Sequence, residues 1–148
     1  MPDNPIAGKA GNTTRLRGML SYFNDNNSLD VTFVSLKDWG MWKEKEANSF
    51  QNKYANIKLE LLEKKFKKNF FKYIFLYKIP YFFKSNSIDI SSYILRKDFE
   101  KIANAQKFDT IIVSYASWGK IIDDVKGNPY LIIDTHDFLT AQKSSKKN

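Results

Sequence analysis

The side chains best suited to chemistry lie together near the end of the sequence, in the stretch Asp134, Thr135, His136 and Asp137. His136 is the only histidine of the chain, and an imidazole beside carboxylates can exchange protons or hydrogen-bond to a bound substrate. A lone histidine at the end of a strand can equally be a structural residue. The polar neighbours have no packing purpose there, and they favour a functional interpretation of His136 and Asp137.

These residues follow a short apolar run, Tyr130–Ile133, and a second polar corner with Ser114 and Tyr115 follows a similar run, Thr110–Val113. Both runs are rich in β-branched residues and indicate buried parallel strands. A helix is predicted between them over residues 117–125. Strand, helix and strand form the right-handed crossover unit of a doubly wound sheet, in which ligands bind beyond the carboxyl ends of the strands. We therefore predict that both corners contact a substrate.

The rest of the sequence predicts further elements of the same α/β class. Apolar residues recur at helical spacing near the start of the chain, and two more runs have the character of strands. The predicted elements are a helix from about Asn12 to Phe23, strands at Val31–Leu36 and Ile57–Leu62, a surface helix within residues 39–52, and a helix at Tyr93–Gln106. Together they predict a Rossmann-like, doubly wound parallel sheet.

In a sheet of strand order 3-2-1-4-5, the first strand is central and immediately precedes the glycine loop. Here the glycine loop opens the sequence, and no strand precedes it. We therefore expect a partial sheet, in which Val31–Leu36 pairs with Ile57–Leu62 and Thr110–Val113 pairs with Tyr130–Ile133. The two inner strands would have unpaired edges unless they pair with each other. Such a chain should be marginally stable or aggregate.

The composition limits the classes of function. The chain has 148 residues, no cysteine and a net charge of +8, which is one domain's worth of sequence without disulfides or thiolate metal sites. With a single histidine, no metal site is predicted. There is no apolar signal segment, and no uncharged run approaches the roughly 18 residues of a spanning helix, so a cytoplasmic location is expected. The positive charge suits nucleic acid or an anionic membrane surface.

The charge is concentrated in the segment Glu63–Lys84, which carries seven lysines against one acid. Spaced four residues apart, its lysines fall on one helical face and its aromatic residues on another. This pattern suits an interfacial helix, and it also suits a core-facing helix with a solvated basic side. No nucleic-acid-binding motif surrounds the segment, so nucleic acid is not predicted as a partner. The residues expected to face a membrane are Lys64, Lys65, Lys68, Lys72, Phe66 and Phe70.

Three stretches resemble the N-terminal domain of GT-B-fold glycosyltransferases, in particular the retaining, nucleotide-sugar-dependent enzymes that build bacterial surface polysaccharides. These stretches are PDNPIAGKAGNTTRLRGML, VTFVSLKDW, and FDTIIVSYASWGKIIDDV followed by YLIIDTHDFLTAQ. The resemblance covers residues 2–36 and 93–142. It implies an incomplete acceptor-side domain at residues 1–142, with the basic segment 63–84 as an insertion and a polar tail at 143–148.

The resemblance implies transfer of a sugar from a nucleoside diphosphate sugar to the hydroxyl of a glycan or lipid-linked acceptor, with no cofactor. In the family, small residues of the glycine loop approach the donor phosphates and the acceptor, and Gly8, Gly11 and Asn12 stand at the matching place. Arg15 could contact phosphate or form a salt bridge on the helix surface. His136 matches a cleft-facing histidine that hydrogen-bonds the donor sugar or the acceptor near the reacting carbon.

The family binds the nucleotide mainly through a second Rossmann-like domain, which this sequence does not contain. We therefore expect the chain to be inactive alone, as a truncated product or the partner of a separate C-terminal half, because half a cleft cannot preorganise the charge stabilisation that transfer needs. As a transferase it would work at the inner face of the cell membrane. The alternative function is a non-enzymatic basic module that binds a membrane surface or a protein partner. The two hypotheses differ over His136, which transfer requires and membrane binding does not.

Overall fold

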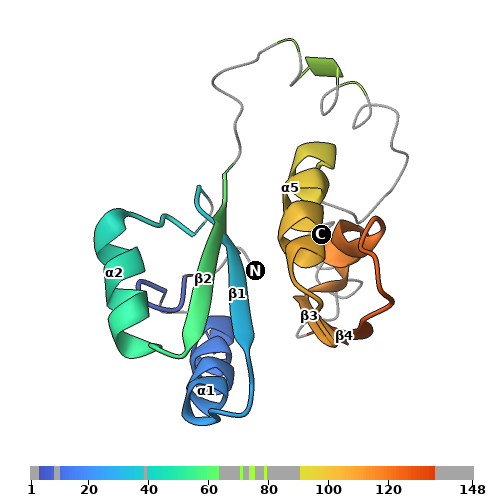
Figure 1. Cartoon of the computed structure of the whole chain (residues 1–148). Coiled ribbons are helices and arrows are strands. Elements are labelled where there is room, and N and C mark those ends of the chain that lie inside the picture. Colours follow the sequence, from blue (N-terminus) through green and yellow to red (C-terminus); the bar gives the residue numbers. More distant parts are fainter. Residues whose placement is uncertain are drawn as a thin grey trace, which may run out of the picture. The chain divides into compact units, whose positions relative to one another are not determined.

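The computed structural model describes residues 4–8, 11–38, 40–63, 71, 74–75, 79 and 91–135. The chain divides into two compact units, Met1–Asn69 and Phe70–Asn148. In the described residues, each unit contains one two-stranded parallel sheet and the helices that accompany it (Figure 1). The predicted α/β class is confirmed.

The first unit is built on the parallel pair β1 (Val31–Leu36) and β2 (Ile57–Leu62). Both strands have the predicted bounds, and their register runs from Val31 opposite Ile57 to Leu36 opposite Leu62. The connection between them contains α2 (Glu44–Lys53), because parallel neighbours need a crossover rather than a tight turn. The predicted helix near the start of the chain is α1, Gly11–Asp25.

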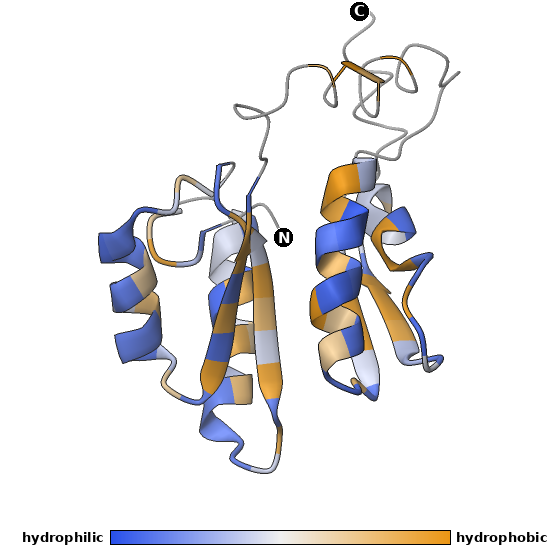
Figure 2. Cartoon of the chain, turned by 45° about the horizontal axis from the view of Figure 1, so that its top comes forward, coloured by the Kyte–Doolittle hydropathy of each residue, from blue (hydrophilic) through white to orange (hydrophobic). Residues whose placement is uncertain are grey.

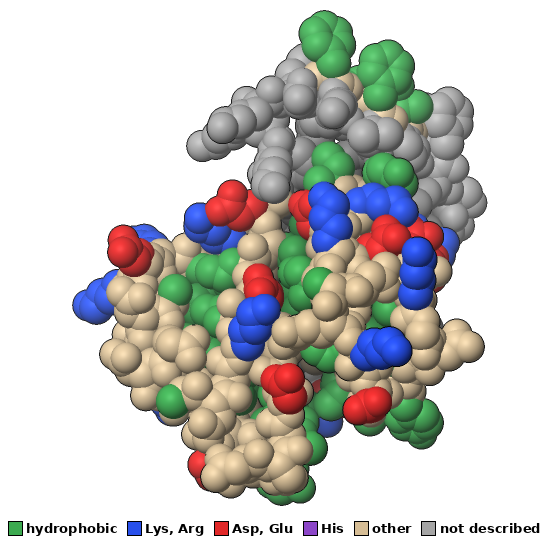
Figure 3. All heavy atoms as spheres, in the orientation of Figure 1, with side chains coloured by type: hydrophobic (Ala, Val, Ile, Leu, Met, Phe, Trp, Pro, Cys, Tyr) green, Lys and Arg blue, Asp and Glu red, His purple; other side chains and the backbone are tan. Residues whose placement is uncertain are grey.

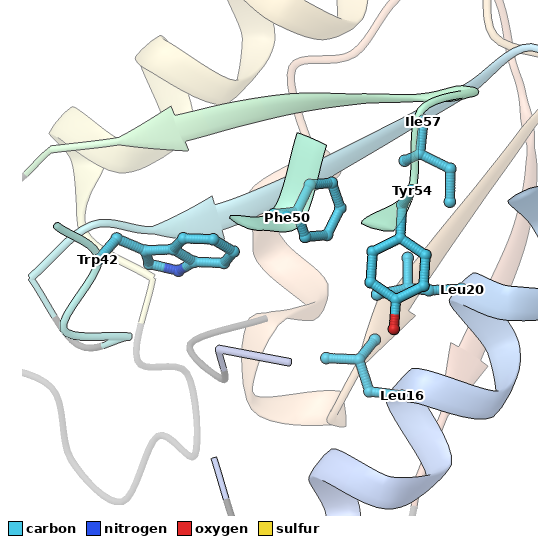
Figure 4. Close-up of a cluster of buried hydrophobic side chains, with 6 residues drawn as sticks. All are labelled: Leu16, Leu20, Trp42, Phe50, Tyr54 and Ile57. Carbon is cyan, nitrogen blue, oxygen red and sulfur yellow. The ribbon is translucent and has the colours of Figure 1, made fainter. Parts of the chain in front are cut away.

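The core of the first unit lies on one face of this strand pair. Tyr54 and Ile57 are at most 1% exposed, and Phe50 of α2 stacks on Phe33 of β1 with ring centroids 5.5 Å apart. The Trp42 indole N–H donates to Ser35 Oγ at 2.9 Å, which satisfies both buried polar groups. The six residues of the core cluster, drawn in Figure 4, are Leu16, Leu20, Trp42, Phe50, Tyr54 and Ile57.

The sequence pattern explains why the strands bury this face. Apolar and charged residues alternate from Ile57 to Leu61 in β2, and Figure 2 shows this alternation in its colours. Because successive side chains of a strand lie on opposite faces, Leu59 and Leu61 join the core and Lys58 and Glu60 lie on the other face. Lys58 Nζ lies 2.9 Å from Glu60 Oε1. The surface helix predicted within residues 39–52 is α2, but Phe50 on its inner side is fully buried.

The second unit is built on the parallel pair β3 (Thr110–Ser114) and β4 (Tyr130–Asp134), preceded by α5 (Tyr93–Ala105). Ser92 caps α5, because its hydroxyl accepts a hydrogen bond from the Leu95 N–H. The described strands therefore form the two predicted pairs as two separate sheets.

The helix predicted over residues 117–125 is instead a 3-10 helix, η3 (Ala116–Ile122). It begins one residue earlier and ends three residues earlier than predicted. The Asp123 N–H donates to the Lys120 carbonyl, an i to i+3 bond that tightens the turn, and the Val125 N–H donates to the Ile122 carbonyl. Gly127 then takes a φ of +90° and turns the chain into β4.

Charged side chains connect α5 with the turn after η3. Lys97 Nζ lies 2.7 Å from Glu100 on its own helix and 3.2 Å from Asp124 beyond η3. The hydrogen bonds to Glu100 and Asp124 raise the pKa of Lys97 to about 12, so this lysine stays charged at neutral pH. Arg96 Nη1 approaches Asp123 at 3.9 Å.

Burial of β4 was predicted wrongly. Ile111 and Val113 of β3 are buried, but Tyr130 is 71% exposed, and Ile132 and Ile133 are both more than one third exposed. In the described residues, η3 packs against the two strands and α5 packs against η3, which covers one side of the pair. A parallel strand is buried on both faces only when helices cover both. None of the helices in the described part of the chain is long and apolar enough to cross a membrane.

Replacement of Tyr54 by Phe should stabilise the first unit. The Tyr54 hydroxyl is buried, points toward the Leu16 side chain in Figure 4, and has no hydrogen-bond partner among the described residues. Its removal abolishes a desolvation penalty of about 1 kcal/mol, and the urea midpoint should rise. Tyr22→Phe, at a side chain that is 65% exposed, is the matched control and should leave the midpoint unchanged. A lower urea midpoint for Tyr54→Phe would show that the Tyr54 hydroxyl forms a stabilising hydrogen bond.

Candidate functional site

The glycine loop is held at the carboxyl end of β1. The Asn4 side chain, 5% exposed, accepts hydrogen bonds from the N–H groups of Ile6 (2.9 Å) and Ala7 (3.2 Å), and its amide donates to the Gly40 carbonyl at 3.0 Å. Gly40 itself donates to the carbonyl of Leu36, the last residue of β1. Asn4 therefore shapes the loop and attaches it to the strand end where ligands bind in parallel sheets.

Arg17 fixes the other side of this loop. Its Nε donates to the Pro5 carbonyl at 2.6 Å, and its Nη2 donates to the carbonyls of Gly8 at 2.7 Å and Ile6 at 3.4 Å. The planar guanidinium reaches several acceptors at once, which an ammonium on a flexible stem does less well. The loop carbonyls therefore turn toward α1.

Sequence reasoning selected Arg15 and missed Arg17. Arg15 is exposed on α1, and its assigned role in phosphate binding stays a prediction. A signal for Arg17 was present, because it lies four residues after the buried Thr13 and three before the buried Leu20. That spacing places Arg17 on the inner face of the helix.

Gly8 and Gly11 serve different purposes. A Cβ at Gly8 would lie 2.5 Å from Thr13 Oγ1 and 2.9 Å from the Asn4 carbonyl oxygen, so the protein itself occupies the space that a side chain would need. A Cβ at Gly11 would have no neighbour within 4 Å. Gly8 is thus required by packing, whereas the space at Gly11, the first residue of α1, is open.

The donor groups that an anion could use lie at the start of α1. The N–H groups of Ile6, Ala7 and Gly8 donate within the loop, the first two to Asn4 Oδ1 and the third to the Asn4 carbonyl. The first turn of α1 begins beside the open space at Gly11 and contains no acidic residue. The positive end of the helix dipole is therefore not neutralised by its own side chains. Asn12 lies in this turn, and its Oδ1 accepts from the Thr13 N–H at 2.8 Å.

In the second unit, Ser114 and Tyr115 form a corner at the carboxyl ends of both strands. Ser114 is buried and lies opposite Asp134 in the register of β3 and β4. The Tyr115 N–H donates to the Asp134 carbonyl at 2.9 Å, and the Tyr115 carbonyl accepts from the Trp118 N–H at 3.0 Å. The Asp134 carboxylate oxygen Oδ2 is buried at this corner. The register thus places Ser114 opposite Asp134 at the strand ends, and the backbone of Tyr115 bonds to Asp134 beside them.

Tyr115 holds a strained backbone at this corner, with φ 70° and ψ 127°. A non-glycine residue rarely adopts a positive φ, and such strain persists only where surrounding contacts enforce it. Here both backbone groups of Tyr115 are engaged, one with β4 and one with η3. The strain fixes the direction in which the chain leaves β3.

Several predicted site residues lie outside the described residues. These are His136, Asp137, Lys64, Lys65, Lys68, Lys72, Phe66 and Phe70, and the polar tail 143–148 lies outside them as well. Their assigned roles stay predictions. In each unit, the predicted residues that the structure describes lie at the carboxyl end of its parallel strands or at the start of α1. In the described part of the chain, no group of acidic residues and histidines could hold a metal ion.

A hollow of about 530 Å³ lies in the first unit beside the loop before β1. Its polar groups largely bond one another: the Asn56 side chain donates to the Asn24 carbonyl at 2.8 Å and to Asn27 Oδ1 at 3.0 Å. These bonds hold the turn between α1 and β1. The hollow is shallow and lies at the amino end of the strands, away from the glycine loop.

Comparisons of the chain with models of known protein families, with curated proteins and with solved structures found no match.

Replacement of Gly8 by Ala should destabilise the first unit by about 1–3 kcal/mol, because the added methyl group overlaps Thr13 and the Asn4 carbonyl. Urea unfolding followed by circular dichroism measures this loss. Gly18→Ala in the neighbouring helix α1 is the control, because a Cβ at Gly18 meets nothing within 4 Å. It should stabilise by about 0.5–1 kcal/mol through its higher helix propensity. Equal effects of the two substitutions would contradict the packing assigned to Gly8.

Two substitutions at Tyr115 should separate backbone strain from side-chain contacts. Tyr115→Gly and Tyr115→Ala remove the same ring, but only glycine tolerates a φ of 70° without strain. The glycine variant should therefore be the more stable by about 1 kcal/mol. Hydrogen exchange of the β3 and β4 amides reports the difference in the second unit. If the alanine variant proved equally stable, Tyr115 would carry no such strain.

Proposed function

We propose that this chain is the acceptor-side, Rossmann-like domain of a glycosyltransferase that uses a nucleoside diphosphate sugar. The observation that carries the proposal is the position of the glycine loop, which Asn4 attaches to Gly40 beyond the carboxyl end of a parallel strand. The same end of a parallel pair carries the Ser114–Tyr115 corner in the second unit. Ligands of doubly wound sheets bind at this end.

The pairing of the strands supports the finer fold assignment. In a sheet of order 3-2-1-4-5, strands two and three are neighbours, and so are strands four and five. The pairs β1–β2 and β3–β4 match these two neighbouring pairs, and each is parallel with a helix in its crossover.

The reaction assigned to the complete enzyme exchanges one bond at the anomeric carbon. The bond from this carbon to the diphosphate oxygen breaks, a bond to the acceptor oxygen forms, and the acceptor proton passes to the leaving diphosphate. The residues of this chain would bind and orient the reactants. The start of α1 suits the negative charge that develops on the diphosphate, because its first turn has no acidic residue and open space lies beside Gly11. His136 keeps the role that the family resemblance implies, a hydrogen bond to the sugar or the acceptor.

The substitution Gly11→Asp should separate phosphate binding from stability. A carboxylate in the first turn stabilises the helix by about 0.3–1 kcal/mol, but it should repel a diphosphate and weaken its binding several-fold. Ligand-observed NMR with uridine, guanosine and thymidine diphosphates measures the binding, and thermal unfolding measures the stability. Gly11→Asn has the same shape without the charge and is the matched control.

The two variants give distinct results under the proposal. The asparagine variant should bind diphosphate like the unchanged chain, and the aspartate variant should bind it less while melting at the same or a higher temperature. Equal binding by both variants would remove the start of α1 from the proposed site. If the unchanged chain bound none of the three nucleotides, the start of α1 would lose its assignment as a diphosphate site.

A further inference from the structure

Two of the described residues hold a strained backbone although they are neither glycine nor asparagine. Met41 has a φ of +48° and Tyr115 has a φ of +70°. Each lies beyond the carboxyl end of the first strand of its unit's pair, since β1 ends at Leu36 and β3 ends at Ser114. Strain of this kind clusters at ligand sites. It therefore points to the end of each strand pair at which ligands of parallel sheets bind.

Met41 is the more informative of the two, because its side chain is 73% exposed. Both of its neighbours in sequence are anchored. The Gly40 N–H donates to the Leu36 carbonyl at 2.9 Å, and the Trp42 indole is buried in the core of the first unit (Figure 4). An anchored turn thus holds a large apolar side chain in solvent, where it takes no part in the core cluster.

Met41 also follows the point at which the glycine loop is attached. The Asn4 side chain donates to the carbonyl of Gly40, the residue directly before Met41, at 3.0 Å. The same loop leads into the start of α1, the proposed site of the diphosphate. On the face shown in Figure 3, acidic and basic side chains are interspersed over the described surface, so charge alone marks no patch. Met41 adds an apolar contact, which phosphate oxygens cannot use and an organic group can.

We propose that Met41 is a contact residue of the diphosphate site and that its thioether packs against the organic group that the diphosphate carries. This inference rests on the proposed function and adds a residue to its site. In a nucleoside diphosphate sugar, the organic group is the nucleoside on one phosphate or the sugar on the other. Both offer apolar ring surface, to which the unbranched, polarizable side chain of methionine adapts. The anchored backbone fixes the start of this side chain before the ligand arrives, which lowers the entropy cost of binding.

Methyl NMR of the full chain tests the contact directly. The chain contains three methionines, so isotope labelling of their ε-methyl groups gives one resonance for each, and the variant Met41→Leu identifies that of Met41. The probes are uridine, guanosine and thymidine diphosphate, each with and without an attached glucose, and inorganic pyrophosphate. The Met41 resonance should shift with at least one organic diphosphate and stay in place with pyrophosphate. A shift without glucose assigns the contact to the nucleoside, and a shift only with glucose assigns it to the sugar.

The contradictory results are distinct. An unshifted Met41 resonance beside a probe that ligand-observed NMR shows to be bound would remove Met41 from the site, while the diphosphate site itself would stand. An equal shift with pyrophosphate would show that the methyl group responds to the phosphates, and the inference would fail. If no probe bound, the diphosphate site would fail together with the contact. The methyl group of Met19, half-buried on α1, is the internal control, and an equal shift there would also overturn the inference.

Two substitutions separate the contact from stability. Met41→Gly removes the side chain and relieves the strain, whereas Met41→Ala removes the side chain and keeps the strain. Both should weaken the binding of an organic diphosphate about threefold or more and leave pyrophosphate binding unchanged. The glycine variant should unfold at a higher urea concentration than the alanine variant.

The control for these variants is Leu29→Ala. It removes an apolar side chain that is 40% exposed just before the amino end of β1, and it should bind like the unchanged chain. Undiminished binding by both Met41 variants would overturn the inference, as would a glycine variant that is no more stable than the alanine variant. Equal loss of binding in the Leu29 variant would contradict a specific contact at Met41.

Discussion

The first unit depends on the burial of one face of a parallel strand pair. Parallel neighbours cannot be joined by a tight turn, so the chain must cross over, and the crossover brings α2 onto the sheet. Phe50 of α2 and the adjoining Tyr54 are then fully buried against Phe33 and Ile57. Each buried aromatic side chain contributes roughly 1.5–3 kcal/mol through the hydrophobic effect. The burial of these rings also fixes where the strand ends point.

The position of the glycine loop depends on the packed strand pair of the first unit. Once β1 is fixed, Gly40 follows its end, and the bond from Asn4 to Gly40 holds the loop there. The Arg17 guanidinium, which extends from α1, donates hydrogen bonds to the loop carbonyls. The Asn4 side chain accepts hydrogen bonds from the loop N–H groups. A loop whose polar groups are satisfied internally is rigid, and its close packing excludes a side chain at Gly8. The open space and the unneutralised helix end lie beside it, at Gly11.

The second unit is held differently. Among the described residues, its strands bury Ile111 and Val113, whereas Tyr130 and much of Ile133 are exposed to solvent. Exposed ion pairs such as Lys97 with Asp124 add little to stability, because water screens them. These ion pairs connect α5 with the turn after η3. An exposed apolar strand surface of this kind favours association. The expected marginal stability of the chain stays a prediction.

The amino-acid sequence by itself determined the local structure. The β-branched runs located all four strands, with bounds that differ from the structure by at most one residue, because strand character depends on adjacent side chains. Helical spacing located α1 and α5 for the same reason. The tertiary structure alone decided the rest. The role of Arg17, the packing that requires Gly8, the positive φ of Tyr115 and the exposure of β4 all depend on residues distant in sequence, or on helices that do or do not cover a strand. Sequence patterns record which residues can be buried, but only three-dimensional packing decides which of them are.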